Sequence, residues 1–240
     1  MVHRYRVCLL APSQHFPSRI ATNIPTFPES QLIPPRANPL KFHSPELKSI
    51  LHLGHILRGA LPRTDFSGPT DPAWNKPDRN CAPATRAHID FTHRGVQLVL
   101  EQEFTPELAK QVCESGDRFV ALSIWKPIKT VQRDPLGFCD GRTVDKEDLV
   151  PLQRVYPDGR EGENVVVKAR REGRGVHDWY WISGQEPDEV VVLKLFDSEE
   201  LDGEGRPRCT QTPHASFSLE GIDEVLEPRE SIEIRVVVCF

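Results

Sequence analysis

Residues 86–91 read Arg-Ala-His-Ile-Asp-Phe, and they begin the part of the chain in which strand-like segments predominate. Apolar and polar side chains alternate along this stretch, as they do in a short β-strand with one buried face. Two helix-like segments follow at 95–103 and 105–115, and the second begins with a capping threonine and a proline. Short β-branched or aromatic runs then follow one another, separated by Gly, Pro and Asp, at 118–125, 152–156, 164–169, 179–182, 190–196, 215–219 and 231–240. This pattern predicts a mainly β fold, a β-sandwich or jelly roll with a few flanking helices.

The front of the chain has a different composition. The first 40 residues are rich in proline and show no clear period, which is typical of an irregular or partly disordered segment. Residues 44–47, Ser-Pro-Glu-Leu, form a helix-start signal and predict a helix that ends at about Arg58. We therefore divide the chain into an irregular or helical N-terminal extension, 1–60, and a single jelly-roll domain, 61–240.

Charge and composition exclude several classes of function. The formal net charge is −5, and acidic and basic residues are interspersed, so there is no basic stripe that would bind nucleic acid. The apolar run at 7–11 is too short for a secretory signal, and no segment reaches the apolar length of a membrane-spanning helix. The six cysteines show no CxxC pair, so neither a zinc ribbon nor a disulfide framework is indicated. These features predict a soluble, cytoplasmic protein without a nucleic-acid or membrane partner.

The pair His88 and Asp90 carries the main chemical signal. Residues two apart in a strand point to the same face, so one imidazole and one carboxylate share a side of the sheet. A second imidazole from a distant strand would complete a ligand set with open positions opposite, as an O₂-activating ferrous centre requires. His214, which precedes the last two strand-like segments, is the favoured third ligand. His93 and His177 are rivals: His93 lies close to the pair in sequence, and His177 adjoins an aromatic run and could line the pocket instead.

The last strand-like segment offers a seat for a carboxylate. Its polar face consists of alternate residues, Arg229, Ser231, Glu233 and Arg235, and its other face of Ile232, Ile234, Val236 and Val238. A guanidinium binds a carboxylate through two parallel hydrogen bonds, and a neighbouring hydroxyl adds another donor. We therefore assign Arg229, with Ser231 beside it, to the far carboxylate of 2-oxoglutarate. Arg235 is the alternative, or contacts the other end of the co-substrate or the substrate.

Residues 85–240 also contain an ordered set of short phrases. They are Ala-His-Ile-Asp at 87–90, Ile-Trp-Lys-Pro-Ile at 124–128, Pro-Leu-Gly-Phe-Cys-Asp at 135–140, Asp-Leu-Val-Pro at 148–151, Trp-Tyr-Trp at 179–181, Pro-Asp-Glu-Val at 187–190, Phe-Asp-Ser at 196–198, Pro-His-Ala-Ser-Phe at 213–217 and Pro-Arg-Glu-Ser-Ile-Glu-Ile-Arg at 228–235. The set resembles a fungal and bacterial family of Fe(II)/2-oxoglutarate oxygenases of secondary metabolism. That family includes cephamycin methoxylation proteins, AsaB-like hydroxylase/desaturases and gibberellin-desaturase-like proteins.

The resemblance implies a double-stranded β-helix, the jelly roll of such oxygenases, and an enzyme that hydroxylates or desaturates a small secondary metabolite. It implies Fe(II) and 2-oxoglutarate as cofactor and co-substrate. The iron ligands that it implies are His88, Asp90 and His214, and the co-substrate contacts are Arg229 or Arg235. Trp125 and Tyr180 become candidates for the pocket wall, with packing in the core as the other interpretation, and Cys139-Asp140 is interpreted as a structural turn.

Two alternatives follow from what the sequence contains and lacks. Residues 1–60 lack the usual opening strands of the family, so a catalytically inactive jelly-roll binding protein is one alternative. A zinc hydrolase on the same three ligands is another, although it would need a general base and no residue is a clear candidate. No P-loop, GxGxxG, GxSxG or kinase signature is present, so nucleotide-dependent and serine-hydrolase functions have no support.

Overall fold

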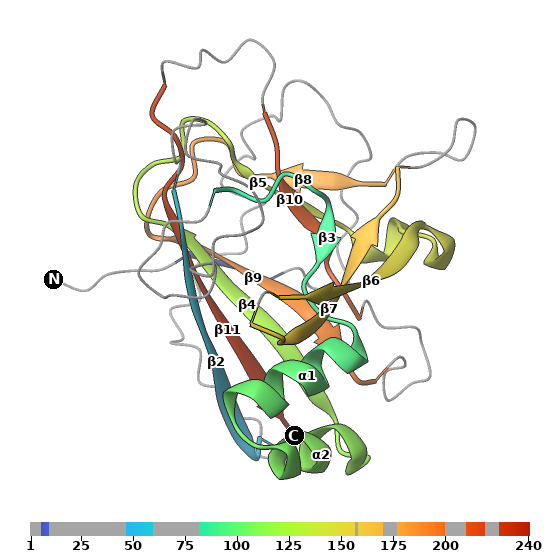
Figure 1. Cartoon of the computed structure of the whole chain (residues 1–240). Coiled ribbons are helices and arrows are strands. Elements are labelled where there is room, and N and C mark those ends of the chain that lie inside the picture. Colours follow the sequence, from blue (N-terminus) through green and yellow to red (C-terminus); the bar gives the residue numbers. More distant parts are fainter. Residues whose placement is uncertain are drawn as a thin grey trace, which may run out of the picture.

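The structure is a computed structural model, and it describes residues 6–9, 47–59, 82–156, 158–169, 177–199, 210–218 and 226–240. Over these residues the strands form two sheets that pack against each other (Figure 1). The first sheet has the order β1 (Arg6–Leu9), β9 (Glu189–Asp197), β4 (Phe119–Pro127), β11 (Ser231–Cys239) and β2 (Ser49–Arg58). The second has the order β6 (Leu149–Val155), β7 (Glu161–Val167), β3 (His88–Ile89), β10 (His214–Ser216), β5 (Leu136–Cys139) and β8 (Trp179–Trp181). The predicted mainly β jelly roll is confirmed.

Pairing within the sheets joins segments that are far apart in the sequence. In the first sheet β11 and β4 pair antiparallel over their whole length, from Ser231 opposite Pro127 to Cys239 opposite Phe119. In the second sheet β3 lies between β7 and β10, and β10 also pairs with β5. The short strand that carries His88 is therefore the direct neighbour of a strand that forms more than a hundred residues later.

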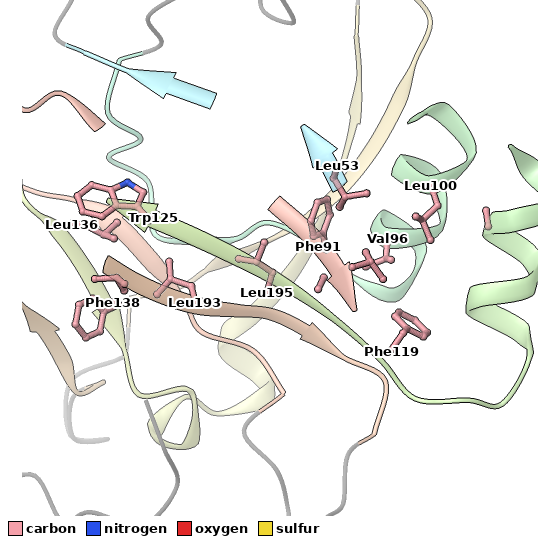
Figure 2. Packing of buried hydrophobic residues seen from close by; sticks show 14 residues of the cluster. Leu53, Phe91, Val96, Leu100, Phe119, Trp125, Leu136, Phe138, Leu193 and Leu195 are labelled. Atoms are coloured by element: carbon pink, nitrogen blue, oxygen red, sulfur yellow. The ribbon is translucent and has the colours of Figure 1, made fainter. Parts of the chain in front are cut away.

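A shared apolar core holds the two sheets and a helix together (Figure 2). Leu193 and Leu195 of β9 meet Phe138 of β5 and Val96 of the first helix, and all four are buried. Burying one such side chain contributes about 1.5–3 kcal/mol relative to leaving it in water. The core therefore fixes the sheets relative to each other.

Two helices, α1 (His93–Glu103) and α2 (Pro106–Glu114), lie at the end of the first sheet near the C-terminus (Figure 1). Thr92 and Thr105 cap them, each hydroxyl accepting a hydrogen bond from a backbone N–H of the first turn. Gly95 of α1 packs so closely on β7 that a Cβ there would collide with the carbonyl oxygen of Glu163. Both predicted helices are confirmed. None of the helices in the described ranges is long and apolar enough to cross a membrane.

The predicted helix that ends at Arg58 is wrong, because residues 49–58 form strand β2. Gly54 has a φ of 99°, which no α-helix accommodates. It lies where the register between β2 and β11 shifts, at Ile234 and Val236, so it forms part of a β-bulge. Pairing with β11 outweighs the helix-start signal, because it satisfies the backbone groups along one edge of the first sheet.

The proline-rich front of the chain contributes β1, which pairs parallel with β9; the rest of the prediction for residues 1–40 lies outside the described residues. The division of the chain at residue 60 stays a prediction. Strand β2 lies in the predicted extension, 1–60, and pairs as an edge strand of the first sheet. Strand β5 was not predicted, because its residues do not alternate. The turn predicted at Cys139-Asp140 is present: Asp140 caps a short 3₁₀ helix, Gly141–Thr143, directly after β5.

Candidate metal centre

His88, Asp90 and His214 lie together where β3 pairs with β10. His88 and His214 are directly opposite each other in the two strands, and their ring centroids are 4.5 Å apart. One carboxylate oxygen of Asp90 lies 3.2 Å from Nε2 of His88 and 3.8 Å from Nε2 of His214. One possible ligand atom from each residue lies within 4.8 Å of the others. The three side chains could therefore bind a single metal ion.

Backbone hydrogen bonds orient both imidazoles. Nδ1 of His88 lies 2.7 Å from the carbonyl oxygen of Arg86, and Nδ1 of His214 lies 3.1 Å from that of Thr212. A carbonyl only accepts, so each Nδ1 carries the proton and donates it. Each Nε2 then faces Asp90, which is the orientation found in metal-binding histidines.

The charge states of the three residues also suit a metal ion. Burial, reinforced by the charge of His88, lowers the pKa of His214 to about 4, so that its imidazole is neutral at pH 7. Burial opposes ionisation of Asp90, but the hydrogen bond from His88 and the charge of His214 hold its pKa well below the usual range. For His88 the penalty of burial is outweighed by the hydrogen bond and charge of Asp90, so its pKa is raised. The ionised carboxylate attracts a cation here, and His214 is already in the neutral form that binds metal. Because its pKa is raised, His88 would release its second proton when a metal ion binds.

The two rival histidines lie elsewhere. Nε2 of His177 is 2.9 Å from Oδ2 of Asp148, and the two form a separate buried pair. His93 is exposed, and its ring packs near Phe119 and Phe196 at centroid distances of 5.9 Å and 5.8 Å. The structure therefore brings His214 to the His-x-Asp pair and neither rival. The role of the three residues as iron ligands stays a prediction.

The predicted carboxylate seat consists of buried donors that lack partners. Arg229 is only 2% exposed and Ser231 only 1% exposed. Nε and Nη1 of Arg229, Oγ of Ser231 and Nε of Arg235 have no hydrogen-bond partner among the described residues. The guanidinium of Arg229 lies 5.2 Å from the centre of the Trp125 ring, and that of Arg235 lies 5.6 Å from the Phe91 ring. Buried donors are normally satisfied, so this group of residues suits an anionic ligand.

A pocket connects the two imidazoles of the triad to the guanidinium of Arg229 in this seat. Its lining residues include Arg58, His88, Trp125, His214, Arg229 and Glu233. Trp125, a candidate for the pocket wall, is among them. Tyr180 and His177, the other two candidates, are not, and Tyr180 instead packs against the apolar core.

Two charged residues that line the cavity, Glu233 and Arg58, were not predicted as site residues from the sequence. Glu233 is 5% exposed and lies 2.9 Å from the hydroxyl of Ser123, and burial raises its pKa. Its place on the same strand face as Arg229 and Ser231 was a usable signal. Arg58 was hidden by the incorrect helix prediction, because a residue at a helix end is not expected inside a sheet.

Comparison with known proteins gives consistent results. A family model described as "Oxidoreductase/YMDC permease-like domain" matches residues 47–239. The α-ketoglutarate-dependent dioxygenase tstK of Talaromyces stipitatus is 32% identical over 196 residues, which are 80% of this chain and 64% of that protein. The dioxygenase phiK of a fungal species is 30% identical and matches 88% of this chain and 70% of its own length. The gibberellin cluster GA4 desaturase of Gibberella fujikuroi is 31% identical, and the match covers 91% of this chain and 65% of that protein.

Solved structures agree with these relatives. The iron and α-ketoglutarate-dependent endoperoxidase NvfI, in one of its conformations, superposes with a TM-score of 0.61 at 25% identity. The match covers 81% of this chain and 61% of NvfI. The chain thus spans less than two thirds of the length of NvfI and of tstK.

Proposed function

Because this chain belongs to the family of fungal α-ketoglutarate-dependent dioxygenases and hydroxylase/desaturases, we propose that it is an Fe(II)/2-oxoglutarate-dependent oxygenase. Its substrate is a small secondary metabolite, which it hydroxylates or desaturates. The observation that carries the proposal is the buried cluster of His88, Asp90 and His214 on a cavity that also contains the unpartnered guanidinium of Arg229.

The donor set fits ferrous iron. Two neutral imidazoles and one carboxylate form the ligand set of mononuclear iron oxygenases, which leaves further positions open for co-substrate and O₂. His88 and His214 would each bind through Nε2, since Nδ1 is engaged with the backbone. Asp90 would bind as the ionised carboxylate and would neutralise part of the metal charge.

The seat fits the co-substrate. The guanidinium of Arg229 and the hydroxyl of Ser231 would bind the far carboxylate of 2-oxoglutarate and thereby satisfy donors that are otherwise buried without partners. Trp125 lies against the guanidinium and limits its contact with water, which strengthens an ionic hydrogen bond there.

With both groups bound, O₂ would be the oxidant: it would take two electrons from 2-oxoglutarate, which becomes succinate and CO₂, and two from an unactivated C–H bond of the substrate. The chain contributes orientation, charge and exclusion of water. Hydrogen bonds to backbone carbonyl oxygens hold the imidazoles of His88 and His214 in place. Arg229 would fix the far end of the co-substrate, and the buried residues around the cavity would limit the access of water.

The protein is further proposed to act in the cytoplasm on a small molecule, without nucleic acid or a membrane as partner. The net charge of −5 and the interspersed acidic residues support this part of the proposal.

The test compares the full chain with the variants His88→Ala and Asp90→Ala, and with His93→Ala as the matched control. Bound Fe(II) is measured under anaerobic conditions, and succinate release from 2-oxoglutarate is then measured with candidate natural products. The wild type and the His93 variant should bind one iron and release succinate, whereas the two ligand variants should lose both properties. Equal succinate release by all four proteins would refute the proposal. A wild type that binds neither iron nor 2-oxoglutarate would instead support the inactive binding protein.

A further inference from the structure

Arg58 lies beside the predicted carboxylate seat although it comes from a different strand. The register of β2 and β11 places Arg58 directly opposite Ser231. Directly opposite residues in an antiparallel pair point to the same face, with Cβ atoms about 4.5–5.5 Å apart. Arg229 precedes Ser231 by two residues, and both arginines line the cavity. Arg58, Arg229 and Ser231 therefore form one patch of donors, which we call the double-arginine patch.

The positive charge of the double-arginine patch is not compensated. Nη1 of Arg58 donates to the carbonyl oxygen of Ala82 at 3.1 Å, and that acceptor carries no net charge. Neither Arg58 nor Arg229 takes part in an ion pair within the part of the chain that the structure describes. Burial, and then the charge of Arg58, lower the pKa of Arg229 to about 10, and the charges of Asp134 and Glu233 offset only part of this effect.

The nearby carboxylates are engaged elsewhere. Asp90 contacts the two imidazoles of the metal cluster. Glu233 lies against Ser123, and burial raises its pKa, which favours the neutral acid. Arg229 is buried and Arg58 is half-buried, and neither has an ion-pair partner among the described residues. A buried cation without such a partner is costly, so the patch suits a ligand that brings a full negative charge.

Resting on the proposed function, we infer that Arg58 is a second guanidinium in the seat for the far carboxylate of 2-oxoglutarate, and that it acts with Arg229 and Ser231. Two guanidinium groups supply enough donors for both carboxylate oxygens, and the pair prefers a dicarboxylic over a monocarboxylic 2-oxo acid. If Arg58 had a purely structural role and only anchored Ala82, its replacement would change the binding of both acids equally.

The experiment compares the wild type and Arg58 variants in their binding of 2-oxoglutarate and of an analogue that lacks the far carboxylate. The full chain is loaded with Mn(II) in place of Fe(II), and binding of 2-oxoglutarate and of 2-oxovalerate is measured by calorimetry. The two acids have the same carbon chain, but 2-oxovalerate has a methyl group in place of the far carboxylate. The variants are Arg58→Gln and Arg58→Lys. Arg94→Gln is the control for charge loss, because Arg94 lies on α1 with a side chain that is 48% exposed.

Arg58→Gln should weaken 2-oxoglutarate binding about 10- to 100-fold, the usual value of one charge-assisted hydrogen bond, while 2-oxovalerate binding changes less than about twofold. Arg58→Lys should recover part of the loss, and Arg94→Gln should bind both acids like the wild type. Equal 2-oxoglutarate affinity in the wild type and Arg58→Gln would overturn the inference and leave the proposed function intact. An equal loss for both acids would also overturn it, in favour of a structural role. A wild type that binds the metal but neither acid would overturn the proposed function itself.

Discussion

Replacing Arg229 by methionine should stabilise the protein in the absence of ligands and at the same time destroy its affinity for 2-oxoglutarate. The reason is that the guanidinium is buried and forms no ion pair with the described residues, and that two of its nitrogens have no hydrogen-bond partner among them. A site that is prepared for an anion is costly while it is empty, because the protein lacks the charge that the ligand would bring.

The cost can be derived from the pKa of Arg229, which falls from an ordinary value of about 12.5 to about 10. One pKa unit corresponds to about 1.4 kcal/mol, so the buried charge destabilises the folded state by about 3 kcal/mol. Arginine is charged in both states at neutral pH, so this penalty is present in full below pH 10 and declines only above it. Contact with the Trp125 ring offsets about 1–2 kcal/mol, which leaves a net gain of about 1–2 kcal/mol for the methionine variant.

For a chain of this length that gain corresponds to a rise in melting temperature of about 2–8 °C. The assays are thermal and urea unfolding of the metal-free protein, and calorimetric titration of the Mn(II)-loaded protein with 2-oxoglutarate. Loss of a buried charge partner should weaken 2-oxoglutarate binding by at least about 30-fold.

The matched control is Arg118→Met. The guanidinium of Arg118 donates to both carboxylate oxygens of Asp197, at 3.0 Å and 2.8 Å, so its removal should destabilise the protein. The reasoning is refuted if Arg229→Met and Arg118→Met both lower the melting temperature, or if Arg229→Met keeps the affinity of the wild type for 2-oxoglutarate.

Two further predictions concern residues outside the cavity. His177→Gln should lose about 1–3 kcal/mol of stability, because the buried side chain of His177 forms a partly buried hydrogen bond with Asp148. The variant should keep a full complement of bound iron. Urea unfolding and metal analysis measure the two effects. Burial opposes the charge of Asp197, but hydrogen bonds from Arg118 and Lys194 outweigh it and lower its pKa. Because the folded pKa is depressed, the contribution of Asp197 is present above pH 4 and is lost as the pH falls below it, so Asp197→Asn should cost about 2 kcal/mol at pH 7 and much less at pH 3. Urea unfolding of both proteins across this pH range tests the sign, and a constant difference between them would contradict it.

The part of the site that could be predicted from the sequence is the part that depends on local geometry. His88 and Asp90 share a face because strand side chains alternate, and this needs no knowledge of the partner strands. The alternation of polar residues on the last strand likewise placed Arg229 and Ser231 together. His214 could be chosen over its rivals only by its position in the chain order, and the structure brings it to His88 through direct pairing of β3 with β10.

Arg58 could not be predicted in the same way, because its place depends on long-range pairing. A serine and a proline at residues 44 and 45 favour a helix locally, whereas β11 is made more than 170 residues later and decides that residues 49–58 form a strand. Strand propensity depends on context, and a bulge at Gly54 breaks the alternation that would have marked β2 as a strand. The sequence therefore predicts the ligands of one strand well and the contributions of its neighbours poorly.

The inner face of β11 explains why the fold and the site depend on one another. Ser231 and Glu233 at its first end line the site region, whereas Val237 at its far end belongs to the apolar core. A shift of one residue in the pairing with β4 and β2 would turn Ile232 and Ile234 inward. It would also turn the carboxyl group of Glu233 out of the cavity and the hydroxyl of Ser231 away from Arg229. The apolar end of the strand resists such a shift, because Val237 on one face and Val236 and Val238 on the other are all buried and would lose their packing partners. The packing that stabilises the core therefore also holds the donors of the carboxylate seat in register, and variants that weaken it should disturb co-substrate binding before they unfold the chain.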